Sequence, residues 1–156
     1  MNIFEIDLNL PPFEVRLKEG KNGTEIFDRI RKKYVSLTPE EWVRQHFVEF
    51  LIEQKKYPQN KISNETSICY NNLNKRCDTI VYDNDFKPLA IVEYKSPKVK
   101  ITQKVFDQIL VYNQKLNVPF LSVSNGLAHI FCKIDLENSK ISFFEQIPDY
   151  KDICRV

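Results

Sequence analysis

The order of helical and strand-like segments constrains the fold of this chain most strongly. A helix is predicted to begin at Pro39, because Thr38 suits the N-cap and Glu41 completes a capping-box pattern. After this helix, which we expect to end near Lys56, come three strands (62–70, 76–82 and 89–95), a helix after Thr102, and two strands (120–124 and 127–134). This order favours an α/β fold in which helices flank a mixed β-sheet.

Each predicted helix carries an apolar stripe that can face such a sheet. In the first helix the stripe is Val43, Phe47, Phe50 and Leu51, at the spacing of one helical face. In the second helix the corresponding face is formed by Val105, Ile109, Tyr112 and Leu116. Both helices are therefore expected to pack on the sheet.

The segments outside this core are expected to belong to the same domain. Residues 13–17 alternate between apolar and polar, and the turn signal Asn22-Gly23 leads into 24–27, which predicts a hairpin over residues 1–37 that covers one edge of the core. Residues 135–156 are expected to add a strand near 141–144 and a tail. The 156 residues contain no linker-like stretch and suffice to bury one core, so we expect a single domain over 1–156 with its core at 38–134.

Glycine content excludes two common types of nucleotide site. The chain has only Gly20, Gly23 and Gly126, whereas Rossmann and P-loop motifs need several glycines close together. We therefore expect no nucleotide cofactor. The four cysteines are scattered, without a metal-binding pair, and are interpreted as reduced thiols. No apolar run approaches the roughly 20 residues of a membrane span and the N-terminus is acidic, so a cytoplasmic location without membrane contact is expected.

Charged residues at the ends of two predicted strands are the best candidates for chemistry. Glu93 and Lys95 follow an apolar run and share one face of their strand, because side chains alternate. Asp78 lies on the preceding strand, on the face that alternation assigns to Arg76 and Ile80 as well. Two carboxylates that converge with a lysine suit a hard divalent cation and its water. The alternative is an ordinary cross-strand ion pair between Asp78 and Lys95 on a solvated face.

The distribution of charge is uneven although the total is close to neutral. The chain has 23 basic and 21 acidic residues, a net charge of +2. Residues 75–104 hold seven basic against four acidic side chains, a net charge of +3, while residues 135–152 have a net charge of −3. Lys98, Lys100 and Lys104 are candidates for contacts to phosphate, or they form a solvated loop that keeps the domain soluble.

Four motifs in this order resemble one known family. They are Arg76-Cys77-Asp78, Ile91-Val92-Glu93-Tyr94-Lys95, the Gln108…Tyr112 pair, and Ser124-Asn125-Gly126. Together they are similar to the nuclease domain at the N-terminus of the type I restriction enzyme R subunit, within the PD-(D/E)XK nuclease superfamily. The resemblance covers about residues 38–134 and implies a restriction-endonuclease-like core with αβββαβ order. Cys77 stands where the superfamily name has proline, and the acid that follows is intact.

The resemblance implies a role for each matching residue. Asp78 and Glu93 would bind Mg²⁺, or Mn²⁺ in its place, with the Tyr94 backbone carbonyl as a further ligand. Lys95 would position the attacking water, and Gln108 and Tyr112 would support the site. Arg76 with the three lysines of the 98–104 segment would contact DNA.

Glu41 has two competing interpretations. As the third residue of its helix it can close the capping box. On a helical wheel, however, it lies between Val48 and Ile52, so that its carboxylate faces the body of the domain. Members of the family often add a carboxylate from the first helix, which makes Glu41 a candidate active-site group.

Two functions follow from these expectations. The first is a Mg²⁺-dependent deoxyribonuclease that resembles the R-subunit nuclease domain and lacks the motor, because no P-loop is present. The second is a non-catalytic module that binds DNA or docks onto other subunits of a restriction or DNA-processing complex.

Overall fold

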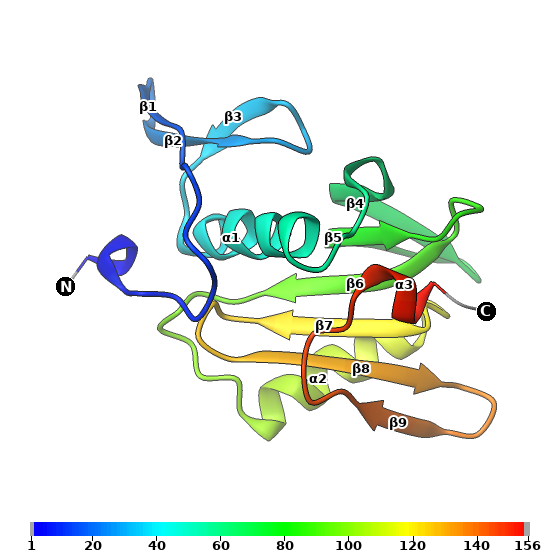
Figure 1. Ribbon diagram of the computed structural model, residues 1–156. Coiled ribbons are helices and arrows are strands. Elements are labelled where there is room, and N and C mark those ends of the chain that lie inside the picture. Colours follow the sequence, from blue (N-terminus) through cyan, green and yellow to red (C-terminus); the bar gives the residue numbers. More distant parts are fainter. Residues whose placement is uncertain (1, 155–156) are drawn as a thin grey trace.

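The computed structural model describes residues 2–154, in which a large β-sheet, a small β-sheet and three α-helices are formed (Figure 1). The large sheet has six strands in chain order, and all neighbours are antiparallel except β6 and β7. Its strands are β4 (Ile62–Tyr70), β5 (Leu73–Tyr82), β6 (Pro88–Tyr94), β7 (Phe120–Ser124), β8 (His129–Asp135) and β9 (Lys140–Phe143). The predicted mixed sheet is therefore confirmed.

Helices cover both faces of this sheet (Figure 1). Helix α1 (Pro39–Glu53) and the short α3 (Tyr150–Ile153) lie on one face, where Val43, Phe47 and Leu51 enter a buried cluster with residues of β5 to β8. Helix α2 (Gln103–Gln114) links the parallel strands β6 and β7 and covers the other face. A parallel pair needs such a crossover connection, which explains the position of α2.

Both predicted helix starts are confirmed. The Thr38 and Thr102 hydroxyls accept hydrogen bonds from the backbone N–H groups of Glu41 and Val105. The predicted buried face of α2 is partly wrong, because Tyr112 is 57% exposed and Phe106 fills the core in its place. The Phe106 side chain has no polar atom and can be buried without a hydrogen-bond partner. The Tyr112 hydroxyl is polar, and on the exposed face of α2 it remains in contact with water.

The N-terminal segment forms a separate sheet of three strands, β1 (Leu17–Gly20), β2 (Gly23–Asp28) and β3 (Lys33–Ser36). The predicted hairpin is present as β1 and β2, but its first strand lies at 17–20 and not at the predicted 13–17. Strand β3 was not predicted. From the sequence, this segment was expected at an edge of the core. It lies instead over α1, as a sheet separate from the large one (Figure 1). The residues that fix it to α1 are also part of the site described below.

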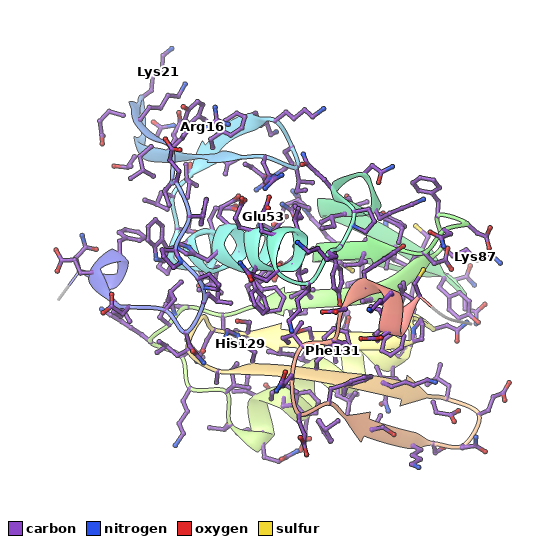
Figure 2. The ribbon with its side chains drawn as sticks, viewed as in Figure 1. Arg16, Lys21, Glu53, Lys87, His129 and Phe131 are labelled. Atoms are coloured by element: carbon purple, nitrogen blue, oxygen red, sulfur yellow. The ribbon has the colours of Figure 1, made fainter. Side chains whose placement is uncertain are left out.

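Residues before β1 cross the C-terminal end of β7 and the start of β8. His129 lies at the start of β8 (Figure 2). Its ring is hydrogen-bonded to the Asn9 carbonyl at 2.9 Å through Nε2 and to the Ser124 hydroxyl at 2.7 Å through Nδ1. Gly126 has φ +86°, and a Cβ there would come within 2.7 Å of Leu8, so the close approach requires glycine. Within residues 2–154 no helix is long and apolar enough to span a bilayer.

Candidate active site

A polar cleft of about 370 Å³ opens where α1 begins and β6 ends. It is bounded by α1 on one side and by Ile109 of α2 on another, and its floor comes from the central strands. The charged side chains that line it are Glu40, Glu41, Arg44, Glu65, Asp78, Glu93 and Lys95. The structure therefore brings together five of the residues that the sequence singled out: Glu41, Asp78, Glu93, Tyr94 and Lys95.

Asp78 is held at the edge of the paired region between β5 and β6. The last paired residues are Thr79 and Val92, so Asp78 and Glu93 are the next residues on the two antiparallel strands. The Asp78 carboxylate accepts a hydrogen bond of 2.9 Å from the Tyr94 backbone N–H, and its own carbonyl accepts one of 2.8 Å from Arg44. Both polar groups of Asp78 are thus fixed from neighbouring elements.

The predicted side-chain alternation along β5 is wrong at this point. Cys77 and Ile80 are three residues apart and yet pack in the same cluster under α2, while Arg76 turns to Glu65 at 2.7 Å. Arg76 and Ile80 therefore do not share a face with Asp78 between them. The facing strand is distorted here, because Glu65 has φ +58°, a left-handed conformation that strands rarely contain.

Glu93 carries the clearest electrostatic signature of the cleft. Burial raises the pKa of its carboxyl to about 7, and the negative charge of Asp78 acts in the same direction. Lys75 opposes this increase through an ion pair with Glu93. The predicted alternative, an ion pair between Asp78 and Lys95, is not formed. Two neighbouring carboxylates repel each other unless a proton or a cation lies between them. Such pairs are typical of functional sites.

Tyr94 and Lys95 point in different directions from the end of β6. The Tyr94 hydroxyl is buried and donates to the Thr79 hydroxyl at 2.9 Å, and burial raises its pKa far above the usual range. Lys95 lines the cleft, and its backbone N–H donates to the Ser124 carbonyl at 2.9 Å. Within residues 2–154 its ammonium group has no ion-pair partner, so Lys95 is a free cation at the cleft.

Glu41 faces the cleft but its oxygens are already occupied. It is 5% exposed and accepts bonds from Arg44 at 2.6 and 2.9 Å, from Gln45 at 2.7 Å and from Arg31 at 2.8 Å. Burial by itself would raise the pKa of Glu41, but these donors, Arg44 first, lower it overall. The carboxylate is therefore ionised, and the structure uses it to hold Arg44.

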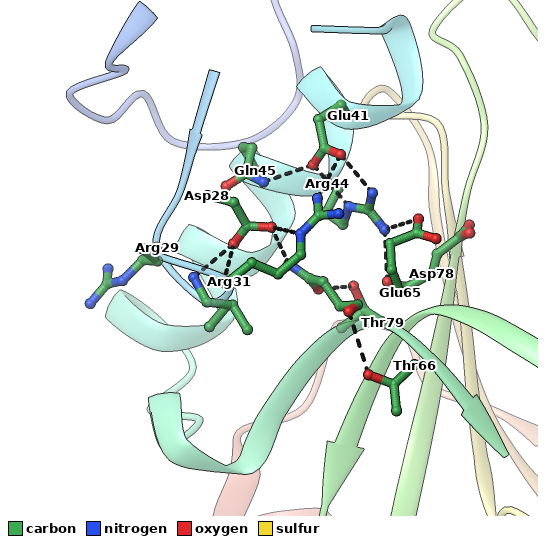
Figure 3. A network of polar contacts seen from close by, with 12 residues as sticks. Asp28, Arg29, Arg31, Glu41, Arg44, Gln45, Glu65, Thr66, Asp78 and Thr79 are labelled. Atoms are coloured by element: carbon green, nitrogen blue, oxygen red, sulfur yellow. Dashed lines mark hydrogen bonds and ion pairs between the residues drawn. The ribbon is translucent and has the colours of Figure 1, made fainter. Parts of the chain in front are cut away.

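The network continues into the N-terminal sheet (Figure 3). Arg31 bonds Asp28 at 2.5 Å, and Asn64 of β4 donates to the same carboxylate at 3.0 Å. Asn64 in turn accepts a bond of 2.7 Å from the Thr79 hydroxyl. Hydrogen bonds thus connect the N-terminal sheet with the strands below the cleft, and with Glu41 through Arg31.

The remaining predicted residues lie at the rim or outside. Gln108 is exposed on α2 and does not line the cleft, while the Tyr112 ring lies 5.3 Å from the Lys75 ammonium. Arg76 is 68% exposed. The three lysines predicted to meet phosphate are all exposed on or beside the loop that follows Lys95: Lys98, Lys100 and Lys104. Asn125 holds this loop by donating to the Val99 carbonyl at 2.8 Å.

Two of the carboxylates are suited to a metal ion. Among residues 2–154 no cluster of three or more His, Cys, Asp or Glu side chains is arranged to bind one. Asp78 and Glu93 nevertheless face each other, and Mg²⁺ is often held by one or two carboxylates together with water and phosphate. Glu93 already binds one cationic group, the ammonium of Lys75. The chemistry of the donors therefore fits Mg²⁺ or Mn²⁺.

Sequence reasoning missed Asp28, Arg31, Arg44 and Glu65. Arg44 and Glu65 carried a signal, since a charged residue within an apolar helix face or a strand needs a partner. Asp28 and Arg31 carried no such signal, because they follow a hairpin that was expected only to cover one edge of the core.

Comparison with known proteins adds three findings. The sequence profile of one family, described as the N terminus of type I restriction enzyme R protein, matches residues 39–148. No curated protein matches. Among solved structures, a fragment described as an HsdR subunit of a type I restriction enzyme from Vibrio vulnificus YJ016 is similar, with a TM-score of 0.52 and 19% identity. The similarity covers 75% of this chain and 24% of that one, and it supports the fold.

Proposed function

Because the chain belongs to the family of the N terminus of type I restriction enzyme R protein, we propose that its cleft is a Mg²⁺-dependent site that cleaves DNA. The observation that carries this proposal is the position of Asp78, Glu93 and Lys95 around one cleft. Two facing carboxylates beside Lys95, which has no ion-pair partner within residues 2–154, supply the side chains that hydrolysis of a phosphodiester needs.

In this proposal Asp78 and Glu93 would hold the cation, with the carbonyl of Tyr94 as a further ligand. A bound Mg²⁺ supplies Lewis-acid polarisation of phosphate and lowers the pKa of coordinated water. Two hydrogen bonds keep Asp78 in place. The Tyr94 N–H donates to its carboxylate, and Arg44 donates to its backbone carbonyl. Glu41 acts through Arg44 and is a positioning residue.

Lys95 would orient the attacking water and stabilise the charge that develops on the phosphate. Its ammonium group is available for this task, because no acidic side chain of residues 2–154 pairs with it. Gln108 and Tyr112 would support the rim next to α2. Arg76, Lys98, Lys100 and Lys104 would contact the DNA backbone, which gives affinity without sequence preference.

The proposed setting is a restriction or DNA-processing complex, with DNA and other subunits as partners. The chain spans only 24% of the length of the similar HsdR chain. The second candidate, a module that binds DNA or a subunit without cleaving, is favoured by the Lys75–Glu93 ion pair, which already neutralises one of the two carboxylates.

Plasmid cleavage with matched lysine variants separates the two candidates. We expect the wild-type chain to nick supercoiled plasmid in Mg²⁺ or Mn²⁺, and Lys95→Ala to be slower by about 10²- to 10⁴-fold. Lys115→Ala is the control, because Lys115 is exposed and lies outside the cleft. Equal rates for all three proteins would exclude Lys95 from catalysis. DNA binding without nicking by any of them would support the non-catalytic module.

A further inference from the structure

Lys75 is a basic residue next to the cleft, paired with the lining residue Glu93, that the proposed reaction leaves unused. Its ammonium group forms the ion pair with Glu93, and both side chains are largely buried, with exposed fractions of 17% and 14%. The aromatic ring of Tyr112 lies 5.3 Å from the same ammonium, within cation–π range. Lys75 is thus held between a carboxylate and a ring face.

Among the described residues, Glu93 forms no ion pair with the other cations around the cleft, Arg44, Arg76 and Lys95. Arg44 binds Glu41 and Glu65, and Arg76 binds Glu65. Lys75 is therefore the side chain that balances the negative charge of Glu93 beside Asp78. A metal ion bound by these two carboxylates would therefore compete with the Lys75 ammonium group for Glu93.

Lys75 is also placed so that it can move away. It lies on the part of β5 that extends beyond the pairing with β6, which begins at Thr79, and its strand partner there is Ile68. Its long, flexible stem would let the ammonium group move towards the exposed Tyr112 without a change of backbone.

We propose that Lys75 is an internal counter-ion that a divalent cation must displace from Glu93, so that Lys75 sets the metal affinity of the cleft. This inference rests on the metal site of the proposed function. Removal of the lysine charge would leave Glu93 without its competitor, and metal binding would become tighter.

Equilibrium binding of Mn²⁺ to the full chain, followed by electron paramagnetic resonance of the free ion, tests this competition directly. We expect Lys75→Met to bind Mn²⁺ about tenfold more tightly than wild type, and Lys75→Arg to bind no more tightly than wild type. Lys115→Met controls for the loss of one positive charge outside the cleft and should match wild type. Asp78→Asn should weaken binding in every background.

Lys75→Met leaves Glu93 without a partner and could lower stability, so thermal unfolding provides a second measurement. Mn²⁺ should raise the unfolding temperature of Lys75→Met more than that of wild type, because tighter binding to the folded state stabilises it more. Unchanged or weaker binding in Lys75→Met, with wild-type binding that depends on Asp78, overturns this inference alone. No binding by any of the proteins overturns the proposed metal site as well.

Discussion

Glu93 is a residue whose ionisation changes strongly on folding. Burial, with the charge of Asp78, raises its pKa from 4.5 to about 7, although Lys75 opposes the shift. Between these two values the folded protein binds a proton that the unfolded chain has released. The stability that this proton contributes is therefore complete below about pH 4.5 and is lost as the pH rises through about 7.

The substitution Glu93→Gln should remove this pH dependence. We expect the free energy of unfolding of wild type to fall, relative to Glu93→Gln, by on the order of 3 kcal/mol between about pH 4.5 and about pH 8. Urea unfolding in chelator at several pH values measures the difference. Asp28 and Glu41, whose pKa values are lowered, affect both proteins equally at acid pH. Parallel pH profiles for the two proteins would show that Glu93 titrates normally.

The sequence predicted several of the side chains that line the cleft, but it did not predict all of their ion-pair partners. Glu93 and Lys95 follow an apolar strand, and this pattern correctly placed both at one cleft. The pairing of Glu93 with Lys75 was not predicted, and neither were the left-handed conformation of Glu65 and the interrupted alternation of β5. Local sequence does not encode where alternation breaks.

Among the elements, the N-terminal sheet has the least expected role. It lies outside the matched residues 39–148, yet Asp28 and Arg31 at the end of β2 connect it to Glu41 and Asn64. Asp28 is fully buried, so its charge depends on these donors. The sheet is therefore bound to the site through polar contacts.

Arg31→Met should weaken this connection strongly. The substitution leaves Asp28 buried without its guanidinium partner, and we expect the free energy of unfolding to fall by about 3 kcal/mol. Lys33→Met is the control, since Lys33 is exposed on β3 and makes no ion pair within residues 2–154. Chemical denaturation compares the three proteins. A loss no greater than that of Lys33→Met would show that the contact contributes little.

Elements with strong local signals were predicted well, and those fixed by distant contacts were not. The caps at Thr38 and Thr102 gave both helix starts, and strand β7 was predicted at its observed bounds. Strand β3 and helix α3 were missed because each has only four residues. Helix α3 is also held by a remote partner, since the Tyr150 N–H donates to the Lys55 carbonyl. Such contacts leave no periodic pattern in the sequence.

On the scale of the whole molecule, the charged residues are unevenly distributed, although the net charge is close to zero. The net charge of +2 combines a basic stretch around the cleft with an acidic C-terminal part. The exposed lysines of the loop follow Lys95, which lines the cleft, and are accessible to a DNA backbone. Affinity for DNA should therefore depend on these lysines and on salt.

Replacement of Lys98, Lys100 and Lys104 by Gln tests this dependence. We expect the slope of log Kd against log salt to fall by about 3, because each phosphate contact releases about one counterion. The matched control replaces three exposed lysines in or next to the acidic part, Lys133, Lys140 and Lys151. Fluorescence anisotropy with duplex DNA gives both slopes. Equal slopes for the two triple variants would place the DNA elsewhere on the surface.

The central claim, a metal-dependent DNA-cleaving site at Asp78 and Glu93, is tested most directly by plasmid nicking as the metal is removed and restored. We expect nicking by wild type in Mg²⁺, its loss in excess chelator and its return when Mg²⁺ is added again. Asp78→Asn, which retains the size of the side chain, should not nick plasmid under any of these conditions. Nicking that persists in chelator, or that Asp78→Asn retains, would contradict the claim.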